Sequence, residues 1–319
     1  MDRARRRSGL LILALAGGMA APAAVPLHEQ RWLAPGADAA RILTRRPVEC
    51  LSKAANADDA YEVELGRAAF RTPLTLGGQA ARAGVDCETC HRNGRANRDF
   101  DFPGLSGAPG TADVTSFLFS SHRGDHVDDP RPIPDLGGPK GALKVSQKPG
   151  SPDLERFIYG LVTEEFDGPE PPPAVLKGLA AYVRALSPTA CRVAGFESVT
   201  VRSAIGDARR AVSAGLAALE KGDHPAAIAM VEAARSVLGA IAERYRAPGL
   251  DDDVRSLSVA DLDLAAAAAD LRRSDPAARE ALDAWLGRSD GWAKRLEADE
   301  ARSYFDRQTL AQAIAGMTE

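Results

Sequence analysis

The sequence is poor in metal-binding and disulfide-forming residues, with four cysteines and five histidines among 319 residues. Aromatic residues make up only 5% of the chain, which argues against a β-rich core. The formal net charge is −4, so there is no surplus of basic residues for a nucleic-acid partner. The chain also has no Gly-rich phosphate loop, no Ser-His-Asp order and no zinc-protease motif. Alanine is plentiful, and this composition predicts an all-α fold whose helices pack through small side chains.

The N-terminus has the layout of a secretory signal. Four arginines precede an apolar run from Gly9 to about Met19, and the small-residue site Ala21-Pro22-Ala23 follows. The apolar run is shorter than the roughly 20 residues that span a bilayer. We therefore predict a cleaved signal peptide over residues 1–23 and a periplasmic location. The alternative is an uncleaved signal, which would be the chain's only link to a membrane.

The segments after the signal differ in their helical patterns. Residues 24–57 lack a clear periodicity and predict an extended N-terminal segment. An amphipathic helix is predicted over 58–70, and its Gly66 would let another helix approach closely. Residues 71–150 are rich in Gly, Pro and Asp and carry no long helical pattern, which is unusual unless something else organises them. Further helices are predicted at 151–162 and 169–188.

Beyond about residue 198 the chain changes to long alanine-rich helices with few breaks. Residues 211–245 predict two antiparallel helices joined at Lys221-Gly222-Asp223. Trp285 and Trp292 lie seven residues apart, which is a helical spacing typical of core anchors. We expect further helices at 258–273, 276–287 and 292–316. The predicted domains are 58–195 and 196–319, and the second is an α-helical hairpin or bundle that either packs or docks a partner.

The run "VDCETCH" brings Cys87, Cys90 and His91 together. A zinc site would need a second pair of ligands at a similar spacing, but the other cysteines, Cys50 and Cys191, stand alone. A thioredoxin-like redox pair would sit in a βαβ setting, and no strand pattern surrounds this run. The third interpretation is one covalent haem c, in which both thiols form thioethers and His91 ligates the iron. The export signal and the loop-rich residues 71–150 both favour haem, because a large apolar cofactor would supply a core.

Three segments resemble a known family. "ELGRAAFRTPLTLGG…VDCETCH" resembles the opening of a cytochrome c domain of the bacterial di-haem cytochrome c peroxidase family, and "DDPRPIPDLGG" resembles the loop that covers its haem. "FDGPEPPPAVLKGLAAYVRALSP" resembles the closing helix of such a domain. The resemblance covers about residues 58–190. It implies a cytochrome c fold whose first and last helices cross, with Gly66 and Phe70 against Leu179 and Val183.

The chain departs from that family in having a single Cys-x-x-Cys-His motif. The family implies two haem domains, so peroxide reduction does not simply carry over. We predict an exported mono-haem cytochrome that transfers single electrons to a periplasmic redox-partner protein. The alternatives are a haem peroxidase with an open distal face, and a haem sensor or docking protein whose helical domain is the output.

The sequence offers several candidates for the sixth iron ligand. No methionine occurs from residue 92 to residue 229, so ordinary methionine ligation is not expected from Met230 or Met317. His122 and His126 lie in the predicted haem-covering loop and are candidate axial ligands. An open sixth position, solvated loop histidines, or a non-haem metal site at His122, Asp125 and His126 are the alternatives.

Cys50 and Cys191 remain after the haem motif is assigned. In an exported protein a leftover even pair of cysteines usually forms a disulfide. We therefore predict a Cys50–Cys191 bond that brackets the haem domain, with two free thiols as the alternative.

Overall fold

Helices dominate the structure, a computed structural model that describes residues 26–123, 126–140, 143–192 and 195–317. The predicted all-α class agrees with this helical content. The predicted signal peptide lies outside the described residues. The long helices are α2 (Ala57–Phe70), α7 (Pro173–Ala185), α8 (Val201–Glu220), α9 (His224–Arg244), α10 (Asp251–Arg272) and α11 (Ala277–Asp299). The shorter ones are α1 (Ala39–Leu43), α3 (Pro73–Leu76), α4 (Gly78–Ala83), α5 (Cys87–Cys90), α6 (Asp153–Gly160) and α12 (Arg307–Ala315).

In the part of the chain that the structure describes, the strands are two or three residues long and pair in three antiparallel ladders. Two of these ladders, β2–β3 and β4–β5, are local to the loop-rich part of the chain. The third, β1–β6, joins the N-terminal segment to the start of the helical part. The strands are β1 (Arg45–Pro47), β2 (His91–Arg92), β3 (Arg95–Ala96), β4 (Thr111–Ala112), β5 (Arg131–Pro132) and β6 (Phe196–Ser198).

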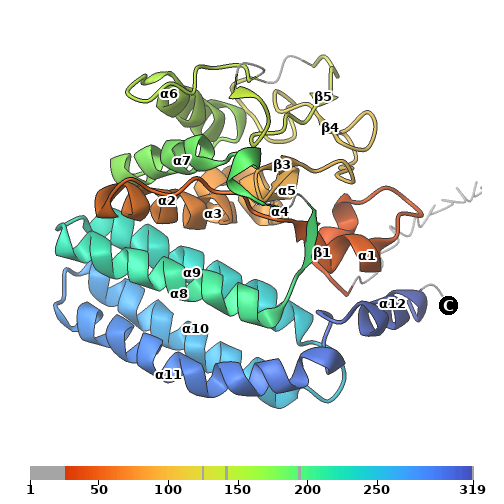
Figure 1. Ribbon diagram of the computed structural model, residues 1–319. Helices are drawn as coiled ribbons and strands as arrows, with labels where there is room; N and C mark the ends of the chain where they lie inside the picture. Colours follow the sequence, from red (N-terminus) through yellow and green to blue (C-terminus); the bar gives the residue numbers. More distant parts are fainter. Residues whose placement is uncertain (1–25, 124–125, 141–142, 193–194, 318–319) are drawn as a thin grey trace, which may run out of the picture.

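Figure 1 shows two stacked parts. The upper part contains α2–α7 and the loops, and the lower part is formed by the four long helices α8–α11. The two parts share one hydrophobic core, because buried residues of α2 and α7 belong to the same cluster as those of α8–α11. The N-terminal α1 packs against the C-terminal α12, which lies beside the bundle. The predicted domain boundary near residue 195 therefore separates segments that are packed together.

The crossing of α2 and α7 matches the expectation from the sequence. Leu65, Gly66, Ala69 and Phe70 are buried on one face of α2, and α7 buries Leu179 and Val183. A Cβ atom at Gly66 would lie 1.9 Å from the carbonyl oxygen of Gly178, so both backbones meet at glycine.

The predicted hairpin of 211–245 is confirmed by α8 and α9. Thr200 and Ser203 form a capping box that begins α8, and Gly222 makes the turn with a φ of 74°. Among the described residues, α9 has a length and composition that would also suit a membrane span, yet 44% of its most apolar stretch is buried inside the structure. A core helix of a helical bundle can have the same length and apolar composition as a membrane span.

Three predicted features of the chain differ from the structure, the first being the helix predicted over 292–316, which is interrupted between Asp299 at the end of α11 and Arg307 at the start of α12. The predicted break between 287 and 292 is wrong, because α11 continues through it while Trp285 and Trp292 make an edge-to-face contact at 5.8 Å. Gly287 and Gly291 face open space and leave the helix intact. The segment predicted to be extended, 24–57, contains a 3₁₀ helix (His28–Trp32) as well as α1 and β1.

Candidate functional site

The Cys-x-x-Cys-His motif lies on a one-turn helix and the hairpin that follows it. Asp86 accepts a hydrogen bond from the Thr89 backbone N–H at 2.8 Å, and the Thr89 hydroxyl accepts one from the Asp86 N–H at 3.2 Å. This capping box fixes the start of α5, a helix that is too short to persist alone. Cys87 and Cys90, three residues apart, therefore share one face of the turn.

Both thiols are free and half-buried. They pack against a second hydrophobic cluster, which we call the loop cluster because residues 71–150 supply most of it. No long helix runs through the described residues of that stretch, so this cluster supplies its apolar core. The loop cluster consists of Trp32, Leu76, Ala80, Val85, Phe100, Leu105, Ala112, Phe119, Ile133 and Val162.

His91 is oriented by a backbone carbonyl. Its Nδ1 lies 3.0 Å from the oxygen of Pro134. A carbonyl only accepts hydrogen bonds, so Nδ1 carries the proton and Nε2 keeps its lone pair. Burial lowers the pKa of His91 to about 4, although Pro134 and Asp135 oppose that shift. The imidazole is therefore neutral at neutral pH, the form in which histidine binds metals.

The residues after His91 form a tight hairpin. Asn93 and Gly94 join β2 to β3 with φ values of 49° and 76°, which is the pattern of a two-residue hairpin turn. The ring of Phe70 on α2 lies 6.4 Å from that of His91. A Cβ at Gly94 would collide with Leu186, at the end of α7. The hairpin is thus fitted between the two crossing helices.

Cys87, Cys90 and His91 fit a covalently attached haem c better than they fit a zinc site or a redox pair. Two thiols on one helical face, a neutral imidazole with a free Nε2 and apolar surroundings are what haem attachment requires. Among the described residues, no group of three or more His, Cys, Asp or Glu side chains is placed to hold a metal ion, as zinc would need. Burial raises the pKa of the Cys90 thiol to about 12 and that of Cys87 further, unlike a reactive redox thiolate.

The two loop histidines lie on the surface. The His122 side chain is 66% exposed, and its Nδ1 pairs with Asp167 at 2.8 Å. His126 is exposed, has a φ of 61° and lies near the ring of Phe117, with 5.8 Å between centroids. Asp125, the third member of the alternative metal site, lies outside the described residues. An axial role for His122 or His126 stays a prediction.

The methionines lie in the helical part. Met230 is fully buried in α9 and packs against Gly215 of α8. Met317 is 40% exposed beyond α12. Met230 therefore serves as a packing residue of the bundle.

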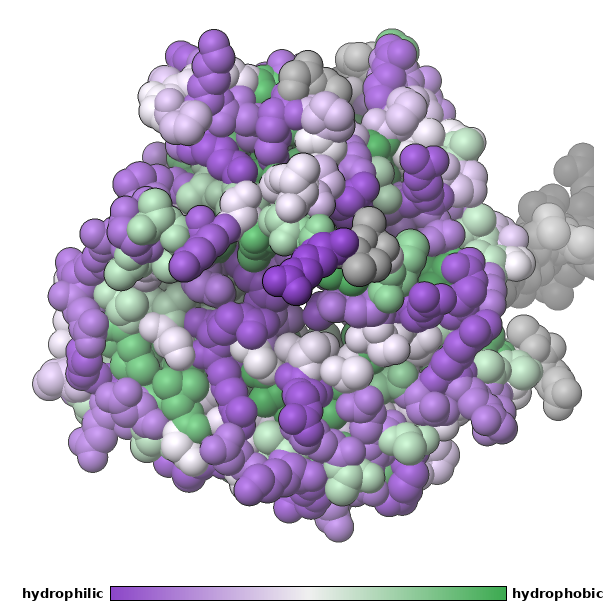
Figure 2. All heavy atoms as spheres, in the orientation of Figure 1, coloured by the Kyte–Doolittle hydropathy of each residue, from purple (hydrophilic) through white to green (hydrophobic). Residues whose placement is uncertain are grey.

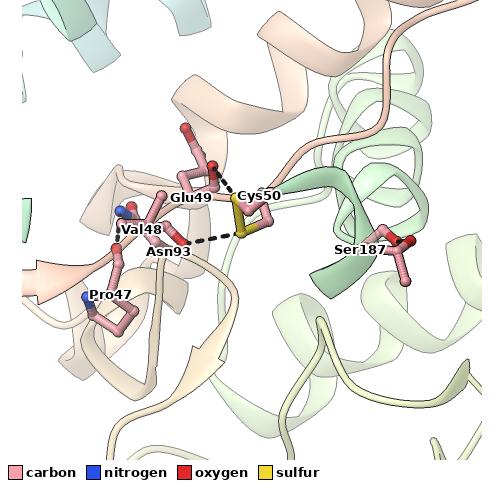
Figure 3. The surroundings of a disulfide bond; sticks show 8 residues. Pro47, Val48, Glu49, Cys50, Asn93 and Ser187 are labelled. Atoms are coloured by element: carbon pink, nitrogen blue, oxygen red, sulfur yellow. Dashed lines mark hydrogen bonds between the residues drawn. A yellow bond between two sulfur atoms is a disulfide. The ribbon is translucent and has the colours of Figure 1, made fainter. Parts of the chain in front are cut away.

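The disulfide predicted from the sequence is present between Cys50 and Cys191. Figure 3 shows it beside Glu49 and Asn93. The Ser187 N–H donates to the Cys50 carbonyl at 2.8 Å, so the segment after α7 and the segment before α2 are also joined by their backbones. The disulfide therefore links the chain just before α2 to the chain just after α7, and it closes the segment between them into a loop.

A buried network of charges lies next to this disulfide and was not predicted. Glu49 accepts hydrogen bonds from Arg67, Arg71 and Tyr182 at 2.7–2.8 Å, and Arg67 also pairs with Asp207 of α8. Burial alone would raise the pKa of Glu49, but Arg71 and Arg67 hold it well below its usual range. A signal was available, because Arg67 lies in the helix predicted over 58–70 and Arg71 follows directly after its end, one helical turn later.

A cavity of about 440 Å³ lies behind α5. Asp86, Glu88 and Thr89 line it, together with His28 and Glu243, but neither thiol nor His91 does. Trp32 and Phe100 of the loop cluster also line it, so the cavity borders the apolar surroundings of the predicted haem site without reaching the motif itself. On the face shown in Figure 2, the surface is hollowed near the centre between the upper part and the bundle.

Comparisons with protein-family models, with curated proteins and with solved structures give no match for this chain.

Proposed function

We propose that the chain is an exported cytochrome that binds one haem c through Cys87 and Cys90, with His91 as an axial ligand, and transfers single electrons in the periplasm. The observation that carries this proposal is the placement of the motif. Two free thiols face an apolar cluster, while His91 is held through Nδ1 and leaves Nε2 for iron.

Each part of the site has a task in this proposal. The capped turn of α5 presents both sulfurs together, and Pro134 fixes the tautomer of His91. The loop cluster excludes water, which lowers the local dielectric around the site. A haem bound here would supply reversible one-electron chemistry.

The crossing of α2 and α7 supports the proposed cytochrome c-like domain over residues 58–195. Gly66 and Gly178 allow the close approach that the resemblance to the di-haem cytochrome c peroxidase family implies. The disulfide is weak support for an oxidising compartment such as the periplasm. A periplasmic redox protein as partner, and the helical part as a docking surface, belong to the same proposal.

The first test is haem staining of the exported protein on a denaturing gel. We expect the wild-type protein to stain and the Cys87→Ala/Cys90→Ala double variant to lose the stain, because each thiol makes one thioether. Ser274→Gly, in the remote turn after α10, is the control and should stain normally. An unstained wild-type band from cells that mature other c-type cytochromes would overturn the proposal.

Absorbance spectra of the oxidised and reduced protein test the iron ligands. His91→Ala should lose the native spectrum, because the proximal ligand would be gone. The charge-transfer band of iron–methionine ligation should be absent, and His122→Ala or His126→Ala should convert six-coordinate to five-coordinate iron if either is axial. Five-coordinate iron in the wild-type protein would favour a peroxidase or a sensor over electron transfer.

A further inference from the structure

Asn93 is a strongly constrained polar residue near the proposed haem site. It is 1% exposed and has a φ of 49°, a conformation that side-chain-bearing residues rarely adopt. It is also the first turn residue of the hairpin that begins with His91. A buried polar residue in this conformation needs compensating contacts.

The contacts of Asn93 join three separate segments. Its backbone N–H donates to Glu88 on α5 at 2.8 Å, and its side-chain Nδ2 donates to the Pro47 carbonyl at 2.7 Å. Its Oδ1 accepts from Arg71 Nη2 at 2.7 Å. Figure 3 shows Asn93 beside Pro47 and Val48, in the strand that leads to the disulfide. The hairpin is thereby fixed to α5, to α2 and to β1.

The groups that hold Asn93 are fixed in turn. Arg71 is buried, pairs with Glu49 at 2.7 Å and lies over the ring of Tyr182 at 5.9 Å. Glu49 is adjacent to Cys50, so the disulfide limits its movement. Asn93 is therefore held in a fixed position, and His91 lies only two residues before it in the chain.

We propose that Asn93 is a positioning residue that sets the orientation of the His91 imidazole on the iron, an inference that rests on the proposed haem function. His91 is held at its ring by Pro134 and at its backbone by the hairpin. Pro134 fixes one ring atom only, so the angle of the ring plane depends on where the hairpin lies. Outer contacts of this kind orient metal ligands and tune the metal.

The test compares the ferric electron paramagnetic resonance spectra of the wild-type holoprotein and Asn93→Gly. Glycine accepts the positive φ, so this variant removes the side-chain hydrogen bonds without straining the backbone. We expect changed g values or a second set of them, because these values report the orientation of the axial imidazole, together with a shifted reduction potential. Ser274→Gly is the matched control, since Ser274 also has a positive φ, of 56°, and lies in the turn after α10.

Asn93→Asp covers the case in which the glycine variant does not fold. Aspartate keeps the acceptor for Arg71 but cannot donate to Pro47, so changed g values are expected from this variant as well. Wild-type g values in a variant that folds and carries one haem would overturn the positioning role while leaving the haem function intact. A wild-type protein without covalent haem would instead refute the proposed function itself.

Discussion

At the residue scale, His28 shows how the N-terminal segment is attached to the bundle. Its backbone N–H and its ring Nδ1 both contact the Glu243 carboxylate of α9, at 2.8 Å and 2.5 Å. Burial lowers the pKa of His28, but the hydrogen bond to Glu243 and the charges of Glu29, Glu243 and Asp86 raise it above its ordinary value. The pKa of Glu243 is lowered by the same pair, against the effect of its burial.

We predict that His28→Gln lowers the stability of the protein in a pH-dependent way. A raised histidine pKa contributes stability that is fully present below the unfolded value, about 6.5, and is lost as pH rises through the folded value. Because His28 is about a third exposed, the contribution should be below about 1 kcal/mol. Urea unfolding at pH 6 and pH 9 should show a larger difference from wild type at pH 6. An equal loss at both values would mean that only packing against Trp32 is involved.

At the proposed haem site, the sequence predicts some residues and misses others for a physical reason. Cys87, Cys90 and His91 are adjacent in the chain, so their spacing alone predicts the chemistry. Arg71 and Asn93 act through tertiary contacts with Glu49 and Pro47, which no local pattern reveals. The Asn93-Gly94 dipeptide was nevertheless a readable hairpin signal.

At the scale of secondary structure, the crossing of α2 and α7 rests on two glycines. We predict that Gly66→Ala costs at least about 3 kcal/mol, since its Cβ would lie 1.9 Å from the backbone oxygen of Gly178 and neither backbone can yield locally. Gly287→Ala is the matched control. It lies mid-helix in α11 with nothing within 4 Å, so alanine should stabilise by about 0.5–1 kcal/mol. Similar unfolding midpoints for the two variants would contradict the close packing of α2 on α7.

Helix prediction failed where local rules and packing disagree. The predicted helices 276–287 and 292–316 left a gap, but buried Trp285 and Ser289 continue one face of α11 across it. The N-terminal segment carries little periodicity, because its elements are short and are stabilised by distant partners. Leu27 and Leu43, for example, pack with Leu310 of α12. In contrast, α8 and α9 were predicted correctly because their apolar pattern, capping residues and turn all agree.

At the scale of the whole molecule, the helical part is joined to the proposed haem domain by both apolar and charged contacts. Asp207 of α8 lies against Arg67 of α2, and both side chains are about nine-tenths buried. A buried pair of this kind adds little net stability, but removing one partner alone is costly. The arrangement fixes how α2 sits on the bundle, so the two predicted domains should unfold together.

The disulfide closes the upper part of the molecule, and its removal should be felt by the whole fold. Cys50 and Cys191 are 141 residues apart in sequence, and the loop between them contains α2 to α7. The chain-entropy model gives about 4.7 kcal/mol for a 100-residue loop and slightly more for a longer one, although realised values are commonly lower. We therefore predict that the Cys50→Ser/Cys191→Ser double variant loses about 3–5 kcal/mol in urea unfolding. Reductant should destabilise the wild-type protein by a similar amount and leave the double variant unchanged. A double variant as stable as the oxidised wild type would show that the Ser187–Cys50 backbone contact and the shared core suffice to close this loop.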